Sequence, residues 1–220
     1  MSELERKAVP ETHRVWLNYR SEKYFGPGRT KKGTGYGKAP TQKAKPAKMK
    51  PVPDHAVGQI TLPTPCGSLV ILASKKGLVG AFYRDRVEPT QLPRKDEGNK
   101  LLREAREQLE EYLDGKRLKF DLPLDARGSA FQKKVWRELL QIPFGQTTTY
   151  GEIAERINQD GASRAVGLAN GSNPLSIIVP CHRVIGANGK LTGYAGGLER
   201  KIWLLDHEVR VLAKGANNQK

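Results

Sequence analysis

A cysteine followed directly by a histidine and an arginine is the strongest chemical signal in this chain. The string Pro180-Cys181-His182-Arg183-Val184 comes just after the apolar run 175–179. A neighbouring base or cation lowers the pKa of a thiol and generates the thiolate, which is the nucleophilic form. The pattern is therefore typical of a nucleophilic cysteine, Cys181, whose thiolate the following His182 or Arg183 would favour.

The place of this pair in the chain limits how it can work. The apolar run predicts a buried strand with Cys181 at its exit, and adjacent side chains of a strand point to opposite faces. A direct contact between Cys181 and His182 would then need a sharp turn, and otherwise a water must bridge them. A carboxylate would have to orient the imidazole, and the closing helix offers Glu199, Asp206 and Glu208.

Two other interpretations of the cysteine stay open on these residues alone. A buried structural cysteine is at least as common as a nucleophile, and Cys66, in a turn between Pro65 and Gly67, fits that description. A cysteine hydrolase would need an oxyanion hole, of which the sequence gives no independent sign. Neither a metal nor another cofactor is expected, because two cysteines and four histidines include no pair at zinc-ligand spacing.

Helices must position this cysteine, since residues 126–212 have a helical pattern. Apolar residues at helical spacing predict one helix over about 131–140. The string Thr149-Tyr150-Gly151-Glu152 fits a capping box that opens a second helix, and Ser163 is predicted to cap a third, Arg164–Asn170. Two short helices joined by a tight, glycine-containing turn predict a helix-turn-helix.

The third predicted helix is built from small residues. Ala165, Gly167, Ala169 and Gly171 would let its backbone approach DNA closely, which suits a narrow minor groove with little base readout. The alternative is a core helix that packs tightly through the same residues. The spacing leaves the two even, and the positive charge of the chain favours DNA.

Residues 56–125 predict a small unit of strands and one helix. The segments 68–72 and 78–82 are rich in β-formers and flank a Lys-Lys-Gly turn, which indicates an antiparallel hairpin or meander. Asn99 is predicted to cap a helix that Gly115 closes. The fold class is therefore α+β, with a small antiparallel sheet and helix first and a helical, helix-turn-helix domain after it.

A net charge of +15 over 220 residues predicts a polyanionic partner, with nucleic acid ahead of a membrane surface. Residues 1–50 hold 13 Lys/Arg against 4 Asp/Glu. Residues 1–55 are predicted to be a largely disordered basic extension that binds phosphates, with a solubilising tail as the alternative. The aromatic stretch 13–25 would pack on the body or stack on bases, and residues 213–220 are predicted to form a tail.

Composition also excludes several classes of protein. No run approaches the ~18 apolar residues of a membrane span, and the first residues lack the apolar region of a secretory signal. Two cysteines cannot build a disulfide-dense scaffold. We expect a protein that is not secreted, cytoplasmic and nucleoid-associated in a bacterium or nuclear in a eukaryote.

Six motifs occur in a consistent order. They are Phe131-Gln132-x-x-Val135-Trp136, Ile142-Pro143-x-Gly145-x-x-x-x-Tyr150, Arg164-Ala165-Val166-Gly167, Ala169-Asn170-Gly171-Ser172-Asn173-Pro174, Pro180-Cys181-His182-Arg183-Val184 and Gly193-Tyr194-x-Gly196-Gly197. Over about 56–210 the chain resembles the O6-alkylguanine-DNA alkyltransferases (methylated-DNA–protein-cysteine methyltransferases), especially the bacterial constitutive form. The resemblance implies a ribonuclease-H-like first domain and a winged-helix-like second domain.

The resemblance also implies what the site residues do. Proteins of this family flip an O6-alkylguanine out of the duplex through the minor groove and take its alkyl group onto a cysteine in one turnover. That implies Cys181 as the acceptor and His182 as a base that acts through a water and is oriented by Glu208. The resemblance also implies that Tyr150 rotates the phosphate and gives a proton to the leaving guanine, and that Arg164 takes the place of the flipped base. Asn173 would link the third helix to the cysteine loop, and Lys201 would assist the thiol. The residues implied to hold the base are Val184, Tyr194 and Ala195, and those implied to contact DNA are Ser163, Ala165 and Gly167.

The chain departs from the family pattern at Ala195, where some relatives carry serine. A hydroxyl contact to the guanine oxygen is therefore missing, although the backbone amide remains. Because the cysteine is present, we predict transfer, with a non-catalytic, alkyltransferase-like lesion binder as the alternative. The predicted partner is double-stranded DNA with alkylated bases, bound by a monomer, and O4-alkylthymine is a further candidate substrate.

Overall fold

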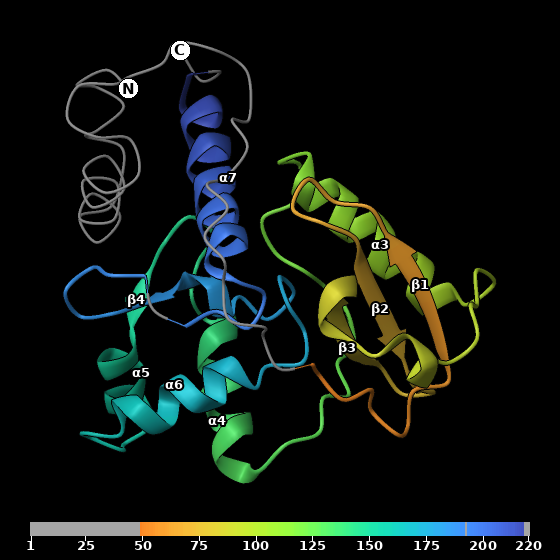
Figure 1. Ribbon diagram of the computed structural model, residues 1–220. Helices are drawn as coiled ribbons and strands as arrows, with labels where there is room; N and C mark the ends of the chain where they lie inside the picture. The colour runs from red at the N-terminus through yellow and green to blue at the C-terminus, as the bar shows by residue number, and fades with distance from the viewer. Residues whose placement is uncertain (1–48, 192, 218–220) are drawn as a thin grey trace.

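The computed structural model describes residues 49–191 and 193–217 of the chain. They form a sheet domain with one covering helix and a second domain of shorter helices, which lie side by side in Figure 1. The long helix α7 (Leu198–Asn217) contacts both, because His207 Nε2 lies 2.8 Å from Tyr112 O in the first domain and Lys201 Nζ lies 2.5 Å from Val184 O in the second. The predicted α+β class and the order of the two domains are confirmed.

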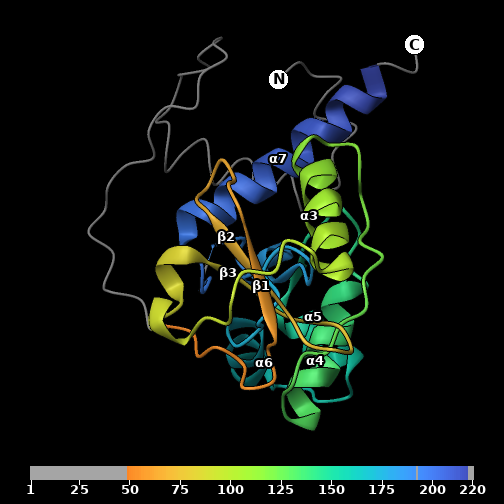
Figure 2. The same ribbon diagram turned by 90° about the vertical axis from the view of Figure 1, so that its right-hand side faces the viewer.

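The first domain is a three-stranded antiparallel sheet. Strands β1 (Gly58–Leu62), β2 (Leu69–Ala73) and β3 (Leu78–Tyr83) are hydrogen-bonded in the order β1-β2-β3, and Ile60 pairs with Ile71. Helix α3 (Lys100–Leu113) packs along the sheet, as Figure 2 shows, and Asn99 caps it as predicted. Two 3-10 turns, η1 (Arg84–Arg86) and η2 (Pro89–Gln91), follow β3.

The opposite face of the sheet is covered by a segment that the sequence assigned to the basic extension. Residues 49–57, which we call the strap, lie against a buried apolar cluster on β2 and β3 that Val52 and Ala56 join. Val57 N donates to Ala73 O over 2.8 Å. The expected extension of residues 1–55 is therefore shorter at its C-terminal end, because apolar side chains of the strap find a sheet face to cover. Residues 1–48, with the aromatic stretch 13–25, lie outside the described residues.

The second domain contains α4 (Ala130–Leu140), α5 (Tyr150–Arg156) and α6 (Ser163–Gly171). Two short parallel strands pair in this domain: β4 (Thr148–Thr149), just before α5, and β5 (Val184–Ile185), just after the 3-10 turn η3 (Cys181–Arg183). Helix α7 then continues beyond the boundary that was expected at residue 212.

Helices α5 and α6 form the predicted helix-turn-helix pair. Thr149 and Glu152 make the expected capping box at α5. The prediction that Ser163 caps the next helix is wrong by one position: Ala162 is the N-cap residue, and no side chain there accepts from the backbone. The turn before α6 contains Gly161 with φ +78°, a left-handed conformation that glycine adopts without strain.

The segment 175–179 is not the strand that its apolar residues predicted. It is a buried turn in which Ile177 has φ +72° and Ile178 N donates to Ser176 O. A short apolar run shows that a segment is buried and not which backbone it adopts, so this kind of error is expected. As a result Cys181 lies in a 3-10 turn and not at a strand exit.

The two domains share one edge and one core. Ala81 in β3 donates its N–H to Pro174 O over 2.8 Å and accepts from Ser176 N over 3.0 Å, so the turn before Cys181 extends the sheet edge. A single buried cluster runs from Ile60 through Tyr112 and Val135 into the helical domain. The sheet therefore holds the cysteine segment directly. Within the described part of the chain, no helix has both the length and the apolar content to cross a membrane.

Candidate active site and DNA-binding face

Cys181 opens the 3-10 turn η3 where the two domains meet. Its backbone is fixed on both sides, because its N–H donates to Val179 O over 2.8 Å and its carbonyl accepts from Asn170 Nδ2 over 3.3 Å. The residue is only 4% exposed. The two free cysteines differ in their surroundings. Cys181 is buried in the site, whereas Cys66 lies in a half-buried turn with its Sγ 3.4 Å from the Tyr83 hydroxyl.

His182 is completely buried and is held by a carboxylate. Its Nε2 lies 2.8 Å from Glu208 Oε1, and both side chains have no exposed surface. Within the described residues no protein atom hydrogen-bonds to its Nδ1. If Nε2 carries the proton toward Glu208, Nδ1 keeps a free lone pair. Burial lowers the pKa of His182, which favours this neutral imidazole that can accept a proton.

Glu208 is the centre of the hydrogen-bond network. Besides His182, its oxygens accept from Arg183 Nη2 at 2.9 Å, from the Tyr112 hydroxyl at 2.8 Å and from Gly145 N at 2.8 Å. The pKa of Glu208 lies well below its usual range, because the charges and hydrogen bonds of His182 and Arg183 outweigh the opposing effect of burial. The carboxylate therefore stays charged and fixes the orientation of the imidazole.

Opposing effects act on the pKa of the Cys181 thiol. Burial raises its pKa, while a hydrogen bond from Asn173 and the charges of Lys201 and Lys50 lower it. Lys201 is fully buried, and burial lowers its own pKa to about 8. A buried thiol whose pKa is raised needs a base to remove its proton, which is the function that the free Nδ1 of His182 can supply.

Asn173 connects the end of α6 to the cysteine turn. Its Nδ2 donates to Val179 O over 2.9 Å, and its Oδ1 accepts from Leu175 N over 3.0 Å. Because the side chain is 97% buried and spans the turn, the helix and the cysteine segment cannot move independently. These contacts are compatible with the link that was expected for Asn173, and its role in the reaction stays a prediction.

Tyr194 and its neighbours form one wall beside Cys181. The Tyr194 ring is buried, and the charge of a Cys181 thiolate acts on its hydroxyl. A Cβ on Gly196 would come within 2.6 Å of the Tyr194 ring and 2.9 Å of the Tyr83 ring, so only glycine fits there. Half-buried Ala195 lies in the same turn, and the buried strand residue Val184 presents its carbonyl to Lys201. These are the residues expected to hold a flipped base.

The exposed face of α6 carries the residues that were predicted to contact DNA. Ser163, Arg164 and Ala165 are exposed, whereas Val166 and Asn170 are buried. A Cβ on Gly167 would lie 3.8 Å from the Tyr150 ring, which places that ring against the helix backbone. The Trp136 indole donates to Ala169 O over 2.9 Å and fixes the buried side. The helix is thus packed on one face and exposed on the other, and contact of the exposed face with DNA stays a prediction.

Two family models match this chain, and together they span most of it. The 6-O-methylguanine DNA methyltransferase ribonuclease-like domain matches residues 59–126, and the DNA binding domain of the same family matches residues 130–210. The chain belongs to this family.

Relatives of the family are similar over both domains. A methylated-DNA–protein-cysteine methyltransferase of Mycolicibacterium paratuberculosis is 50% identical over 71% of this chain and 90% of its own length. One of Methanosarcina acetivorans is 49% identical over 66% of this chain and 94% of its own. The crystal structure of Mycobacterium tuberculosis OGT in complex with DNA superposes with a TM-score of 0.66 at 46% identity, covering 70% of this chain and 94% of that one. These likenesses support an enzyme of DNA repair, and the non-catalytic alternative is not favoured.

Among the three carboxylates proposed to orient the base, only one reaches it in this methyltransferase-family fold. Glu199 is exposed in the first turn of α7, and Asp206 pairs with Arg210 at 3.3 Å. Glu208 alone points from α7 to His182. Spacing along the helix did not distinguish the three, because the packing of α7 decides which of its faces meets His182.

Several residues around the site were not expected from the sequence. Tyr112, Asn170 and Lys50 were not candidates, and Arg183 was noted only as a nearby charge. Arg183 could have been found, because a buried arginine beside a catalytic pair requires a carboxylate partner. Tyr112 carried no such signal, since its position predicted only the buried face of a helix. Leu168 is also new: it is 73% exposed on α6, four residues after Arg164.

Proposed function

We propose that this protein repairs O6-alkylguanine in duplex DNA by transferring the alkyl group to Sγ of Cys181, once per molecule. The observation that carries the proposal is the buried group Cys181, His182 and Glu208, whose cysteine is hydrogen-bonded through its carbonyl to Asn170 on the buried side of α6. Family membership supports the reaction class. The acceptor and its partners are assigned on this geometry together with the sequence motifs.

The proposed reaction is an in-line displacement at an sp³ carbon. His182 Nδ1 takes the thiol proton through a water, and the thiolate then attacks the alkyl carbon of the flipped base. The carbon–sulfur bond forms as the bond from carbon to O6 breaks, and the electron pair leaves with guanine. Tyr150 gives a proton to that leaving group. The product is a thioether, which water does not readily cleave, so each protein molecule acts once.

Binding of the duplex is assigned to the helix-turn-helix. Arg164 would enter the base stack, where its planar guanidinium can stack and donate hydrogen bonds together. Ser163, Ala165 and Gly167 would line the minor groove, and exposed Leu168 would add an apolar contact there. We expect the protein to act as a monomer in the compartment that holds the genome.

The deciding experiment uses a duplex with one radiolabelled O6-methylguanine, followed by peptide mapping. We expect one label per protein molecule, on the peptide that contains Cys181. Cys181→Ser should abolish labelling while the duplex is still bound, because the α6 face is unchanged. The matched variant Cys66→Ser should label normally. Repeated turnover would indicate a hydrolase, and tight lesion binding by the wild type without label would indicate a binding module.

A second experiment separates base flipping from chemistry. Arg164→Ala should slow transfer from duplex DNA at least tenfold and leave transfer from a free O6-alkylguanine base nearly unchanged, since Arg164 is exposed and apart from the buried thiol. Arg156→Ala, on α5, is the control and should affect neither substrate strongly. Equal loss on both substrates would contradict the role assigned to Arg164.

A further inference from the structure

The strap reaches the active-site domain from a part of the chain that precedes both family-matched ranges. Lys50 N donates to Arg86 O over 2.6 Å, and the backbone of Lys50 forms an isolated parallel β-bridge with Val87. Farther along, Arg127 Nη1 binds Asp54 Oδ1 at 2.9 Å. The family models begin at residue 59. The backbone of the strap is therefore fixed on the sheet domain, and the Lys50 side chain extends from it to the helical domain.

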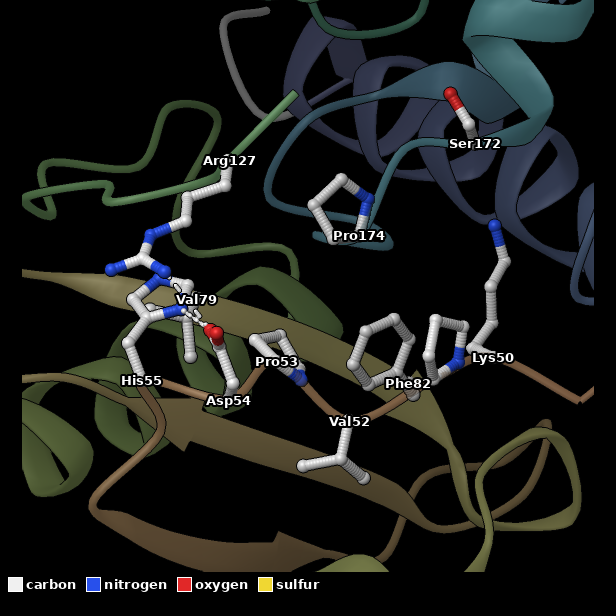
Figure 3. A pocket seen from close by; sticks show the side chains of 11 residues that line it. Lys50, Val52, Pro53, Asp54, His55, Val79, Phe82, Arg127, Ser172 and Pro174 are labelled. Atoms are coloured by element: carbon white, nitrogen blue, oxygen red, sulfur yellow. Dashed lines mark hydrogen bonds and ion pairs between the residues drawn. The ribbon is translucent and has the colours of Figure 1, made fainter. Parts of the chain in front are cut away.

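A cavity of about 240 Å³ lies between the strap, β3 and the segment that follows α6. Figure 3 shows the Lys50 side chain rising along one side of this cavity, with its ammonium toward the side where Ser172 lies. Phe82 and Pro174 make apolar walls beside it. An ammonium on such a path gives up part of its hydration and must be compensated where it ends.

The Lys50 ammonium ends at the last turn of α6. Its Nζ donates to Gly171 O over 2.6 Å, and a helix C-terminus favours a positive charge. The preceding residue, Asn170, binds the carbonyl of Cys181. Two adjacent residues in the last turn of α6 therefore bind the two segments: Gly171 binds Lys50, and Asn170 binds the carbonyl of Cys181.

Charge connects the two groups as well. Burial lowers the pKa of Lys50, and the charge of Cys181 opposes that change. Conversely, Lys50 is one of two lysines that lower the pKa of the Cys181 thiol, after Lys201. The lysines approach from different elements, Lys201 from α7 and Lys50 from the strap.

We propose that Lys50 is a positioning residue of the alkyl transfer: its ammonium, held at the C-terminal end of α6, favours the Cys181 thiolate from outside the two family domains. The inference rests on the proposed function, because it assumes that Cys181 is the acceptor. It adds a second cation to the site, on a segment that the family motifs do not include.

Other groups around Cys181 set the background for this effect. Lys201 supplies the larger favourable charge, Asn173 donates a hydrogen bond, and Tyr194 and His182 complete the surroundings. None of these side chains belongs to the strap. Removing the Lys50 charge should therefore lower the thiolate fraction without abolishing it.

The test compares Lys50→Met, which keeps the length of the side chain, with Lys50→Arg, which keeps the charge. Lys76→Met, in an exposed turn, is the control. The rate at which iodoacetamide alkylates Cys181 is followed from acid to alkaline pH by mass spectrometry of the Cys181 peptide. Single-turnover transfer of labelled methyl from duplex DNA is measured on the same samples.

We expect the midpoint of the alkylation profile to move to higher pH in Lys50→Met, with a threefold to about tenfold lower rate near neutral pH, since one pKa unit is tenfold in thiolate. Lys50→Arg and Lys76→Met should keep the wild-type midpoint. If Lys50→Met keeps the wild-type midpoint, the proposal is wrong, even if DNA affinity falls, because loss of a helix cap alone would weaken binding and leave the thiol unchanged. Failure of the wild type to label Cys181 would instead refute the proposed function.

Discussion

At the scale of single residues, the site depends on one carboxylate. Glu208 receives hydrogen bonds from His182, Arg183, Tyr112 and the Gly145 amide, and its side chain has no exposed surface. A buried charge is tolerated only when its partners replace the water that it has lost. The same contacts that stabilise the carboxylate orient the imidazole, so stability and chemistry share one residue.

Glu208→Gln should therefore lower the free energy of unfolding at neutral pH by roughly 3–5 kcal/mol, because it leaves Arg183 buried without its counter-charge. Transfer should fall with it, as the imidazole loses the negative charge of its partner. Denaturant unfolding and single-turnover labelling measure the two effects. The exposed acid Glu199 provides the control, and Glu199→Gln should change neither quantity. A Glu208→Gln protein as stable as the wild type would contradict this account of the network.

The pKa of Glu208 also predicts how stability depends on pH. It is lower in the folded protein than the ordinary value of 4.5, so the unfolded chain takes up a proton first as the pH falls. Stability from this residue is present above pH 4.5 and is lost below it. The wild type should lose stability between about pH 5 and pH 3, and Glu208→Gln should lose less over that window. Urea midpoints at several pH values test this, and parallel curves would argue against it.

At the scale of elements, α3 of the sheet domain supports the site in the helical domain. Tyr112 is fully buried on α3, packs against Phe144 with ring centroids 5.7 Å apart, and donates to Glu208 on α7. The first domain therefore supplies a hydrogen bond to the residue that holds the base. This contact gives the sheet domain a direct part in the geometry of the site.

Tyr112→Phe removes that hydrogen bond and keeps the ring. We expect the free energy of unfolding to drop by about 1–2 kcal/mol, the usual cost of leaving a charged acceptor short of one donor. Combined with Glu208→Gln, the two losses should not add, because Tyr112→Phe then removes a hydrogen bond whose acceptor has already lost its charge. Unfolding free energies of the two single variants and the double variant form the test. Additive losses would show that Tyr112 stabilises the fold independently of Glu208.

A second prediction at this scale concerns Gly167, one of the small residues of α6. A Cβ at Gly167 meets the Tyr150 ring at an ordinary contact distance of 3.8 Å. Gly167→Ala should therefore fold well and gain up to about 1 kcal/mol of helix stability. Gly167→Leu should keep the fold and transfer poorly from duplex DNA, because its side chain blocks the approach of the groove. Thermal unfolding and labelling distinguish the two, and full transfer by Gly167→Leu would place DNA elsewhere.

At the scale of the whole molecule, positive charge is concentrated at the N-terminal end. Residues 1–50 carry 13 of the 38 Lys/Arg side chains of the chain. The strap fixes the C-terminal end of this segment beside α6, through Lys50 and Gly171. The basic residues 1–48 therefore join the described part of the chain beside α6, the helix that we assign to the duplex.

Deleting residues 2–48 should weaken duplex binding and flatten its dependence on salt, because each lost phosphate contact removes about 0.9 from the slope. The strap and Lys50 remain, so transfer from a free O6-alkylguanine base should not change. Binding titrations at several salt concentrations, with the free-base rate as control, measure both effects. An unchanged slope would mean that these residues do not touch DNA.

Local patterns determined much of this protein. The capping box at Thr149, the cap at Asn99, the β-rich segments and the succession of Cys181 and His182 all depend on residues close together in the chain. Such signals are readable because the atoms involved are neighbours through the covalent backbone. The motifs that resemble the alkyltransferases are local in the same sense, and the family assignment is confirmed.

Contacts between distant segments were decided only by the tertiary structure. Whether Glu199, Asp206 or Glu208 met His182 depended on how α7 docked, and the backbone of 175–179 depended on the sheet edge at Ala81. Tyr112 and Lys50 lie 96 and 121 residues from their partners Glu208 and Gly171. The chain itself sets which groups can react and which helices can form. Only the packing of both domains around one core sets which of those groups come within hydrogen-bonding distance, because burial and direction are properties of the folded chain.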